Sequence, residues 1–160
     1  GKNKYGNVSP AYPFGVHIAE VEVDTETGQV DLLNYWACHD VGRIINKMML
    51  EGQVEGGIMQ GAGWALMERM VTEKGRIMNP NFLDYRCPGS MDTPKMYIDF
   101  VETNDPNGPF GAKGIGEPAL NPVPAAIANA IYNAIGIRFT TLPVTSEKIL
   151  RAIKGIEAKD

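Results

Sequence analysis

Five glycines interrupt a segment whose apolar residues otherwise follow the spacing of one long helix. Between residues 47 and 71 the apolar side chains recur at helical intervals, and Asn46 stands where an N-cap is needed. Each glycine inside a helix costs about 1 kcal/mol relative to alanine, so the pattern indicates a neighbouring backbone or a ligand at very short distance. Tight packing through small residues is the simpler alternative, but it leaves the polar Gln53 and Gln60 unexplained. The five glycines are Gly52, Gly56, Gly57, Gly61 and Gly63.

A second glycine-rich segment, residues 107–117, ends in a carboxylate. Its last seven residues read Gly-Ala-Lys-Gly-Ile-Gly-Glu, and Pro118 restricts Glu117 to extended backbone. Glycine lets a backbone approach a bound group closely because it has no Cβ. A plain helix-entry loop, with Glu117 complementing the helix dipole, is the alternative. The glycine spacing does not fit the dinucleotide-binding fingerprint, and the sequence Gly-Lys-Ser or Gly-Lys-Thr of a P-loop does not occur.

The remaining segments predict an α+β fold with mixed strands. Residues 15–25 alternate apolar and polar side chains, residues 26–28 form a turn, and residues 29–41 are rich in β-branched and aromatic types, so we expect a hairpin. Residues 75–94 read as an irregular excursion, residues 95–103 as a further strand and residues 139–143 as a short edge segment. Two C-terminal helices follow the glycine loop: residues 119–135, with Ile127, Ile131 and Ile135 on one stripe, and an amphipathic helix that Thr145 opens.

Size and charge limit the kinds of partner. A chain of 160 residues with 44% hydrophobic content can bury one core, and a net charge of −4 argues against nucleic acid. No apolar run is long enough for a membrane span and no signal peptide opens the chain, so we expect a cytoplasmic protein. The first residue is glycine, which suggests a fragment or a processed subunit. We expect residues 1–14 to connect to other domains and residues 15–160 to form a single lobe.

Metal ligation by side chains has little support in the sequence. Cys38 and His39 are adjacent and cannot readily converge on one ion, and His17 and His39 read as packed or surface residues. Cys38 and Cys87 are the only cysteines, and nothing in the pattern supports a disulfide between them.

Four ordered motifs make the chain similar to the C-terminal part of the molybdopterin-binding large subunit of the xanthine dehydrogenase and aldehyde oxidase family. The resemblance covers nearly the whole chain. One departure is Lys47, where family members usually carry proline. The motifs are Asp-Val-Gly-Arg-Ile-Ile-Asn at residues 40–46, the glycine-rich segment 52–66, the Asp-Tyr, Pro and Asp-Thr-Pro elements within residues 84–94, and Gly-Ala-Lys-Gly-Ile-Gly-Glu-Pro at residues 111–118.

The resemblance implies roles for particular residues. Glu117 matches the catalytic general base beside the molybdenum, and Gln53 matches a glutamine that contacts the pterin. Gly114 and Gly116 would lie against the cofactor, and Lys113 would either orient the cofactor or hold the loop. No protein side chain is expected to ligate the metal, because the pterin supplies its ligands. The cofactor would be molybdopterin, either in its simple form or as the cytosine dinucleotide.

The resemblance also implies an activity and partners. A molybdenum hydroxylase or dehydrogenase would insert water-derived oxygen at an electron-poor carbon of an N-heterocycle or aldehyde, a small-molecule substrate. The other domains of the subunit, together with 2Fe-2S and FAD on partner subunits or domains, would complete an oligomeric enzyme, and this piece alone would be inactive. The alternative is a non-catalytic assembly or binding domain that retains the fold.

Overall fold

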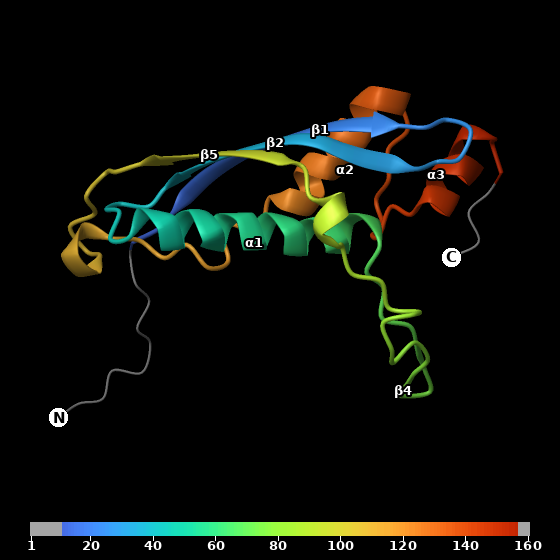
Figure 1. Cartoon of the computed structure of the whole chain (residues 1–160), viewed down its shortest axis with the longest axis horizontal. Coiled ribbons are helices and arrows are strands. Elements are labelled where there is room, and N and C mark those ends of the chain that lie inside the picture. The colour runs from blue at the N-terminus through green and yellow to red at the C-terminus, as the bar shows by residue number, and fades with distance from the viewer. Residues whose placement is uncertain (1–10, 157–160) are drawn as a thin grey trace.

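A three-stranded sheet covered on one face by helices forms the body of the protein. The computed structural model describes residues 11–156, so the expected connecting segment 1–14 lies largely outside the described residues. The sheet has the order β1 (Phe14–Val23), β2 (Val30–Asp40), β5 (Lys95–Val101). Helix α1 (Lys47–Leu66) runs along the sheet and packs on α2 (Val123–Ile135), while α3 (Ser146–Ile153) lies at the far end (Figure 1). The α+β class is confirmed.

The expected hairpin is present, and its turn is closed by a local network. β1 and β2 pair antiparallel, with a bulge between Glu20 and Val21. The Asp24 carboxylate accepts hydrogen bonds from the backbone N–H of Glu26 at 2.8 Å and from the Thr27 hydroxyl at 2.8 Å. Such side-chain bonds to a following backbone stabilise a turn without help from the rest of the fold.

β5 pairs parallel to β2, a relationship that the sequence pattern did not reveal. Asn34 lies opposite Lys95 and Asp40 opposite Val101. Parallel pairing places the carboxyl ends of both strands at one edge of the sheet. The segments that leave β2 and β5 therefore start side by side, and this is where the two glycine-rich segments meet.

The core lies between the sheet and the two longer helices. Alternate residues of β2 point inward, so that Tyr35 and Ala37 are buried. The stripe expected on residues 119–135 is confirmed for Ile127 and Ile131, which are fully buried, and Ile135 packs against the same cluster. No helix among residues 11–156 covers the other face of the sheet, where Val16 and Ile18 are exposed (Figure 1).

The close contacts predicted for the glycine-rich helix are confirmed at three of its glycines, Gly57, Gly61 and Gly63. A Cβ on Gly57 would lie 2.7 Å from the Cβ of Ala119, and one on Gly61 would lie 2.5 Å from the Cβ of Val123. Both distances are shorter than carbon atoms tolerate. At these two positions, glycine lets α1 pack directly on the segment that leads into α2.

Both histidines are packed, as expected, and with Tyr35 they form a cluster of polar side chains on β1 and β2. The His17 Nδ1 lies 3.0 Å from the Tyr35 hydroxyl, and its Nε2 lies 2.7 Å from the Nε2 of His39. Burial, and secondarily the charge of His39, lowers the pKa of His17 to about 4. The buried Nδ1 of His39 has no hydrogen-bond partner among residues 11–156.

The helix predicted for residues 47–71 ends earlier, at Leu66. The Asn46 cap is as predicted, its side chain accepting from the Met49 N–H at 3.1 Å. At the other end the N–H of Glu68 turns back to the carbonyl of Gly63 at 2.7 Å, and the Tyr85 hydroxyl donates to the Glu68 carboxylate at 2.6 Å. The backbone thus leaves the helical path at Met67 and Glu68, and a hydrogen bond from the arm holds Glu68 in that position.

Two further expectations differ from the structure near the C-terminus. The helix expected from residue 119 begins at Val123, because Pro122 and Pro124 lack the N–H that an earlier start would need, and residues 116–122 form turns instead. Residues 139–143 pair with no strand in the described part of the chain; the next residue, Val144, donates its N–H to the Ala65 carbonyl at 2.6 Å. The segment thus closes the end of α1 and adds nothing to the sheet.

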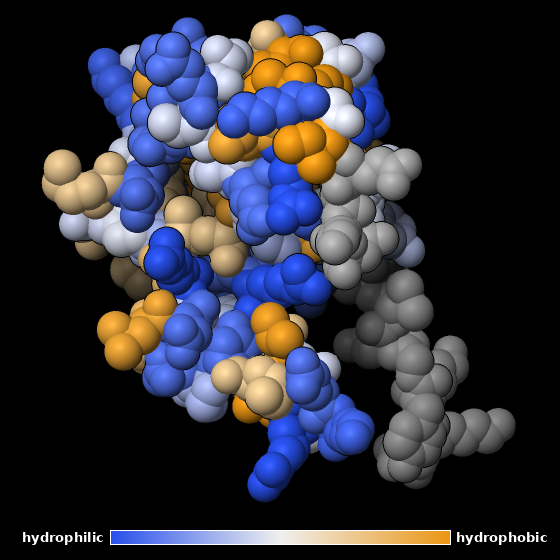
Figure 2. Space-filling model, turned by 90° about the vertical axis from the view of Figure 1, so that its right-hand side faces the viewer, coloured by the Kyte–Doolittle hydropathy of each residue, from blue (hydrophilic) through white to orange (hydrophobic). Residues whose placement is uncertain are grey.

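An arm projects from the body between α1 and β5, and it starts earlier than the predicted excursion. Within it β3 (Thr72–Glu73) and β4 (Arg76–Ile77) form a small hairpin, and the short helix η1 (Ser90–Asp92) leads back to the sheet (Figure 1). Lys74 and Gly75 both have positive φ, as a two-residue hairpin turn requires. In the view onto the α3 end of the molecule, the hydrophobic residues of the arm form separate groups among hydrophilic ones (Figure 2).

Both cysteines are free: Cys38 is half-buried on β2 and Cys87 is exposed on the arm. Among residues 11–156 no helix is long and apolar enough to cross a membrane.

Candidate cofactor site

The site begins where β2 ends. Val41 and Gly42 are buried, and Gly42 has a φ of +69°. A Cβ at Gly42 would lie 2.2 Å from the carbonyl oxygen of Gly111, so the turn after β2 touches the glycine loop directly. Only glycine satisfies both the backbone angle and the space available here.

The start of α1 forms the second wall. Asn46 caps the helix, and the apolar side chains before and within the first turn are left open to solvent: Ile45 is 70% exposed and Met49 is 66% exposed. Gln53 follows one turn later on the exposed side of the helix. An apolar lining with a few polar groups is the usual composition of a site for an organic ligand.

The glycine loop forms the third wall, and backbone hydrogen bonds fix its path. The Lys113 N–H donates to the Val41 carbonyl at 2.8 Å, and the Asp105 N–H donates to the Gly111 carbonyl at 3.0 Å. The short helix η2 (Pro109–Gly111) turns the chain just before these bonds. The loop thereby lies along the edge where β2 and β5 end.

The Lys113 side chain points into the protein, where its ammonium group lies between two carboxylates. Its Nζ lies 2.6 Å from the Asp40 Oδ2, 3.7 Å from the Asp105 Oδ2 and 5.5 Å from the centre of the Phe14 ring. Of the two roles predicted for Lys113, holding the loop is the one that this geometry favours.

A cavity of about 340 Å³ lies between the three walls. Gln53 lines it from α1, Lys113 and Ile115 line it from the glycine loop, and Arg43 lines it from the turn after β2. Gln53 and Lys113 are sixty residues apart in the sequence, and the sequence predicted a role for each without showing that they share one cavity. Arg43, Asn46 and Met49 also line it and were not singled out as site residues, although Arg43 and Asn46 belong to a quoted motif.

Glu117 lies just beyond this cavity in an exposed turn. Its backbone carbonyl accepts from the Leu120 N–H at 2.9 Å, and no ion pair among residues 11–156 uses its carboxylate. Two residues later the buried Ala119 packs on Gly57 of α1. The chain just after Glu117 is therefore held against the glycine-rich helix, and the Glu117 carboxylate has no ion pair within the described chain.

Four of the glycines around this site have no role in packing within the described chain. A Cβ on Gly52 or Gly56 of α1, or on Gly114 or Gly116 of the loop, would meet nothing within 4 Å, and none of the four has a positive φ. Neither the backbone angle nor a neighbour in residues 11–156 requires glycine at these positions. Bare backbone facing open space on both the helix and the loop fits the close approach of a group that this chain does not contain.

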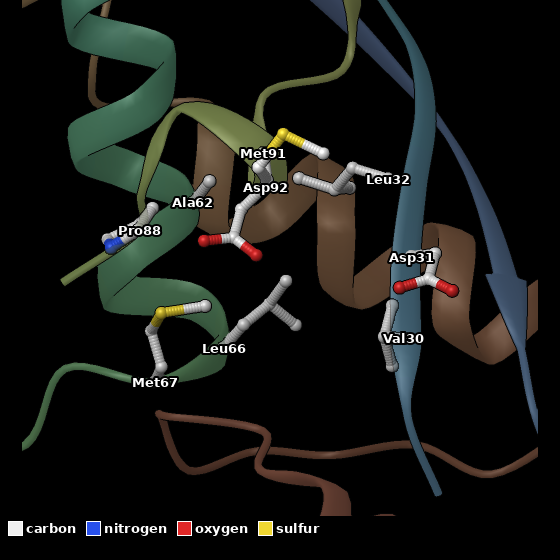
Figure 3. Close-up of a pocket in the computed structure, with 9 residues that line it drawn as sticks. All are labelled: Val30, Asp31, Leu32, Ala62, Leu66, Met67, Pro88, Met91 and Asp92. Carbon is white, nitrogen blue, oxygen red and sulfur yellow. The ribbon is translucent and has the colours of Figure 1, made fainter. Parts of the chain in front are cut away.

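A second cavity, of about 160 Å³, lies at the other end of α1 and contains none of the predicted site residues. Asp92 of η1 points into the space between α1 and β2, and Asp31 of β2 stands across from it (Figure 3). Both carboxylates already have partners: the Gly89 N–H donates to Asp92 at 2.7 Å and the Gln29 amide donates to Asp31 at 2.9 Å. We therefore assign the site to the cavity beside the glycine loop, which Gln53 and Lys113 line.

Comparisons with known proteins agree with this placement of the chain in a cofactor-binding fold. Residues 1–94 match the family model of the molybdopterin cofactor-binding domain. The chain is 41% identical over 138 residues to the xanthine dehydrogenase molybdenum-binding subunit of Escherichia coli O157:H7, covering 85% of this chain and 18% of that relative. It is 38% identical to the nicotine 6-hydroxylase large subunit of Paenarthrobacter nicotinovorans, covering 92% and 18%.

Solved structures share the fold closely. Quinoline 2-oxidoreductase from Pseudomonas putida 86 superposes with a TM-score of 0.83 at 35% identity, covering 89% of this chain and 19% of that chain. Aldehyde oxidoreductase from Desulfovibrio gigas gives a TM-score of 0.82 at 38% identity, covering 89% and 15%. The chain spans about a fifth of the length of the curated relatives it matches. By its sequence and its fold, this chain belongs to the family of molybdopterin cofactor-binding domains.

Proposed function

We propose that this chain is the C-terminal part of the molybdopterin-binding subunit of a molybdenum hydroxylase or dehydrogenase. The observation that carries the proposal is that Gln53 of α1 and Lys113 and Ile115 of the glycine loop line one cavity, while the same two segments carry four glycines that no packing contact in the described chain requires. The relatives named as molybdenum-binding subunits and as oxidoreductases support the same assignment.

The residues present fit an extended organic cofactor. The backbone of Gly114 and Gly116 in the loop can be approached without an intervening side chain, and Gly52 and Gly56 leave the surface of α1 equally bare. Gln53 offers both a donor and an acceptor. No group of three or more His, Cys, Asp or Glu side chains among residues 11–156 could hold a metal ion. The metal would accordingly be held by the pterin, with cofactor contacts from Gln53, Gly114, Gly116 and the part of Lys113 that lines the cavity.

Glu117 is the proposed general base. When bound, the cofactor supplies the molybdenum and the redox step. The Glu117 carboxylate would accept the proton of the water-derived oxygen that attacks an electron-poor carbon of an N-heterocycle or aldehyde. General-base help of this kind is worth about 10²–10⁴ in rate. An exposed carboxylate with no ion pair in the described chain is available for this role.

The cavity is open, and completing it is the proposed role of the rest of the subunit. The relatives are about five times longer than this chain, and we propose further domains of the same polypeptide together with iron–sulfur and flavin subunits as partners. Relatives named for nicotine, aldehydes and carbon monoxide resemble this chain at similar levels. The substrate is therefore selected by residues outside this chain, as is the pterin form, for which the cytosine dinucleotide is one candidate.

The decisive test is Glu117→Gln in the full-length subunit assembled with its partners. We expect turnover to fall by at least about 10²-fold, with molybdenum and pterin content unchanged. Glu22→Gln is the matched control, because Glu22 is an exposed glutamate at the opposite end of the hairpin. Wild-type turnover in Glu117→Gln would refute the general-base role and favour the alternative, a non-catalytic assembly or binding domain.

A further inference from the structure

Asp40 joins three segments that are far apart in the sequence. Its Oδ2 accepts from the Lys113 ammonium at 2.6 Å in the glycine loop, and its Oδ1 accepts from the Gly42 N–H at 3.0 Å after β2. The Thr103 hydroxyl, in the segment after β5, donates to the same carboxylate at 2.8 Å. One side chain thus connects the ends of both parallel strands to the loop.

The charges in this cluster are shielded from water. The Lys113 side chain is 6% exposed, that of Asp40 12% and that of Asp105 13%. An ammonium so little exposed requires opposite charge nearby, since removing one partner leaves an uncompensated charge. Burial opposes ionisation of Asp40, but hydrogen bonds from Lys113, Gly42 and Thr103 together lower its pKa below the usual value. The ion pair of Lys113 and Asp40 therefore links the glycine loop to the end of β2 inside the protein.

Backbone bonds repeat the same connection. The Lys113 N–H donates to the Val41 carbonyl at 2.8 Å, and the Asn104 N–H donates to the Gly42 carbonyl at 2.7 Å. The path of the loop up to Lys113 is thus determined by both backbone and side-chain contacts with the end of β2.

Between Lys113 and Glu117 the chain has little else to hold it. A Cβ on Gly114 or Gly116 would meet no atom within 4 Å. Of the residues between Lys113 and Glu117, only Ile115 packs partly against the core. The next firm contact is Ala119, which is fully buried against α1. Glycine gives a loop wide conformational freedom, so the position of Glu117 depends on the contacts at either end of this short span.

We propose that Asp40 is a positioning residue: by pairing with Lys113 it sets where the glycine loop, and through the loop Glu117, lies beside the cofactor cavity. On this proposal the Lys113 ammonium acts through Asp40 and does not contact the cofactor. The inference rests on the proposed general-base role of Glu117.

The test uses the full-length subunit in its assembled complex, with Asp40→Asn, Lys113→Met and the double variant. We expect each single variant to lower kcat by about 10²-fold, the scale of a small misplacement of a catalytic group, with KM little changed and molybdenum content intact. The double variant is expected to be no worse than either single variant, because both remove one interaction. Asp99→Asn, at an exposed position on the outer face of β5, is the matched control.

Two more measurements separate positioning from general damage. Hydrogen–deuterium exchange of residues 111–117 is expected to increase in Asp40→Asn and Lys113→Met but not in Glu117→Gln. Lys113→Arg, which keeps the charge, is expected to recover most of kcat. Should Asp40→Asn fail to assemble, Lys113→Gln serves as a milder variant, for which faster loop exchange together with lower kcat is expected.

Three results would overturn the proposal. The first is wild-type kcat and wild-type loop exchange in Asp40→Asn or Lys113→Gln. The second is loss of molybdenum content in Lys113→Met alone, which would make the ammonium a direct cofactor contact. The third is additive loss in the double variant. Retained turnover in Glu117→Gln refutes the proposed function and this inference with it, whereas an inactive Glu117→Gln beside an unimpaired Asp40→Asn refutes only the inference.

Discussion

Gly56 and Gly57 are neighbours on α1 with opposite surroundings, which makes them a matched pair for alanine substitution. A Cβ at Gly57 would lie 2.7 Å from the Cβ of Ala119 and 3.1 Å from its carbonyl carbon, whereas a Cβ at Gly56 would meet nothing within 4 Å. Both sites lie inside the same helix. The gain in helix propensity is therefore the same for both, and a difference between the two variants reports the close contact alone.

The magnitudes follow from these distances. Alanine in place of glycine within a helix gains about 1 kcal/mol, so Gly56→Ala is expected to stabilise α1 by about that amount. At Gly57 the same gain is offset by overpacking against Ala119, which costs about 1–3 kcal/mol. Gly57→Ala should consequently be less stable than Gly56→Ala by about 1–3 kcal/mol.

The assay is native-state hydrogen exchange of the α1 amides in the full-length subunit, with molybdenum content measured on the same samples. We expect Gly56→Ala to protect α1 more strongly and yet to bind less cofactor, because its new methyl group occupies open space on the surface of α1 that we assign to the approach of the cofactor. Gly57→Ala should lose α1 protection. Equal protection in the two variants would refute the packing argument, and full cofactor content in Gly56→Ala would refute the assignment of the open glycines to ligand approach.

The other predictions concern a cap, a buried histidine pair and the arm. Asn46→Ala removes the bond to the Met49 N–H and should weaken the first turn of α1 by about 1 kcal/mol, seen as faster exchange there; Asn46→Asp should retain most of the protection, and unchanged exchange in Asn46→Ala would contradict the cap. His17 has a pKa of about 4 in the folded protein against an ordinary value of 6.5. As the pH falls, the unfolded chain therefore binds a proton at this residue before the folded protein does. The contribution of neutral His17 to the free energy of unfolding is complete above pH 6.5 and is lost as the pH falls towards 4. Urea midpoints on the two sides of this window should differ less in His17→Gln, and an equal difference would exclude His17 as the cause. Tyr85→Phe removes the hydrogen bond to Glu68 and should speed exchange in residues 67–71 by an amount equivalent to about 1 kcal/mol; no change there would show that the bond does not hold the segment after α1.

Local features of the fold could be predicted from the sequence because their causes lie within a few residues. The alternation in residues 15–25 and the turn at Gly28 produced the hairpin, and the Asn46 cap depends only on the residue three positions later. The end of α1 could not be predicted in the same way. Residues 67–71 keep a helical pattern, and it is Tyr85, on the distant arm, that binds Glu68 after the helix has stopped.

The candidate site divides along the same line. The sequence singled out Gln53, Lys113, Gly114, Gly116 and Glu117 by residue type and spacing, and the catalytic and cofactor-binding roles of these residues stay predictions. The cavity that Gln53 and Lys113 share depends on the parallel pairing of β2 and β5, which no local pattern encodes.

The sequence by itself determined which segments form helices and strands, because periodicity, capping and turn residues act over a few positions. The tertiary structure alone decided which glycines are needed for packing and which are left open, and it directed the Lys113 charge towards Asp40, seventy-three residues away. The reason is physical: short contacts and shielded ion pairs exist only once distant segments are brought together, so their energies cannot be assigned to any segment in isolation.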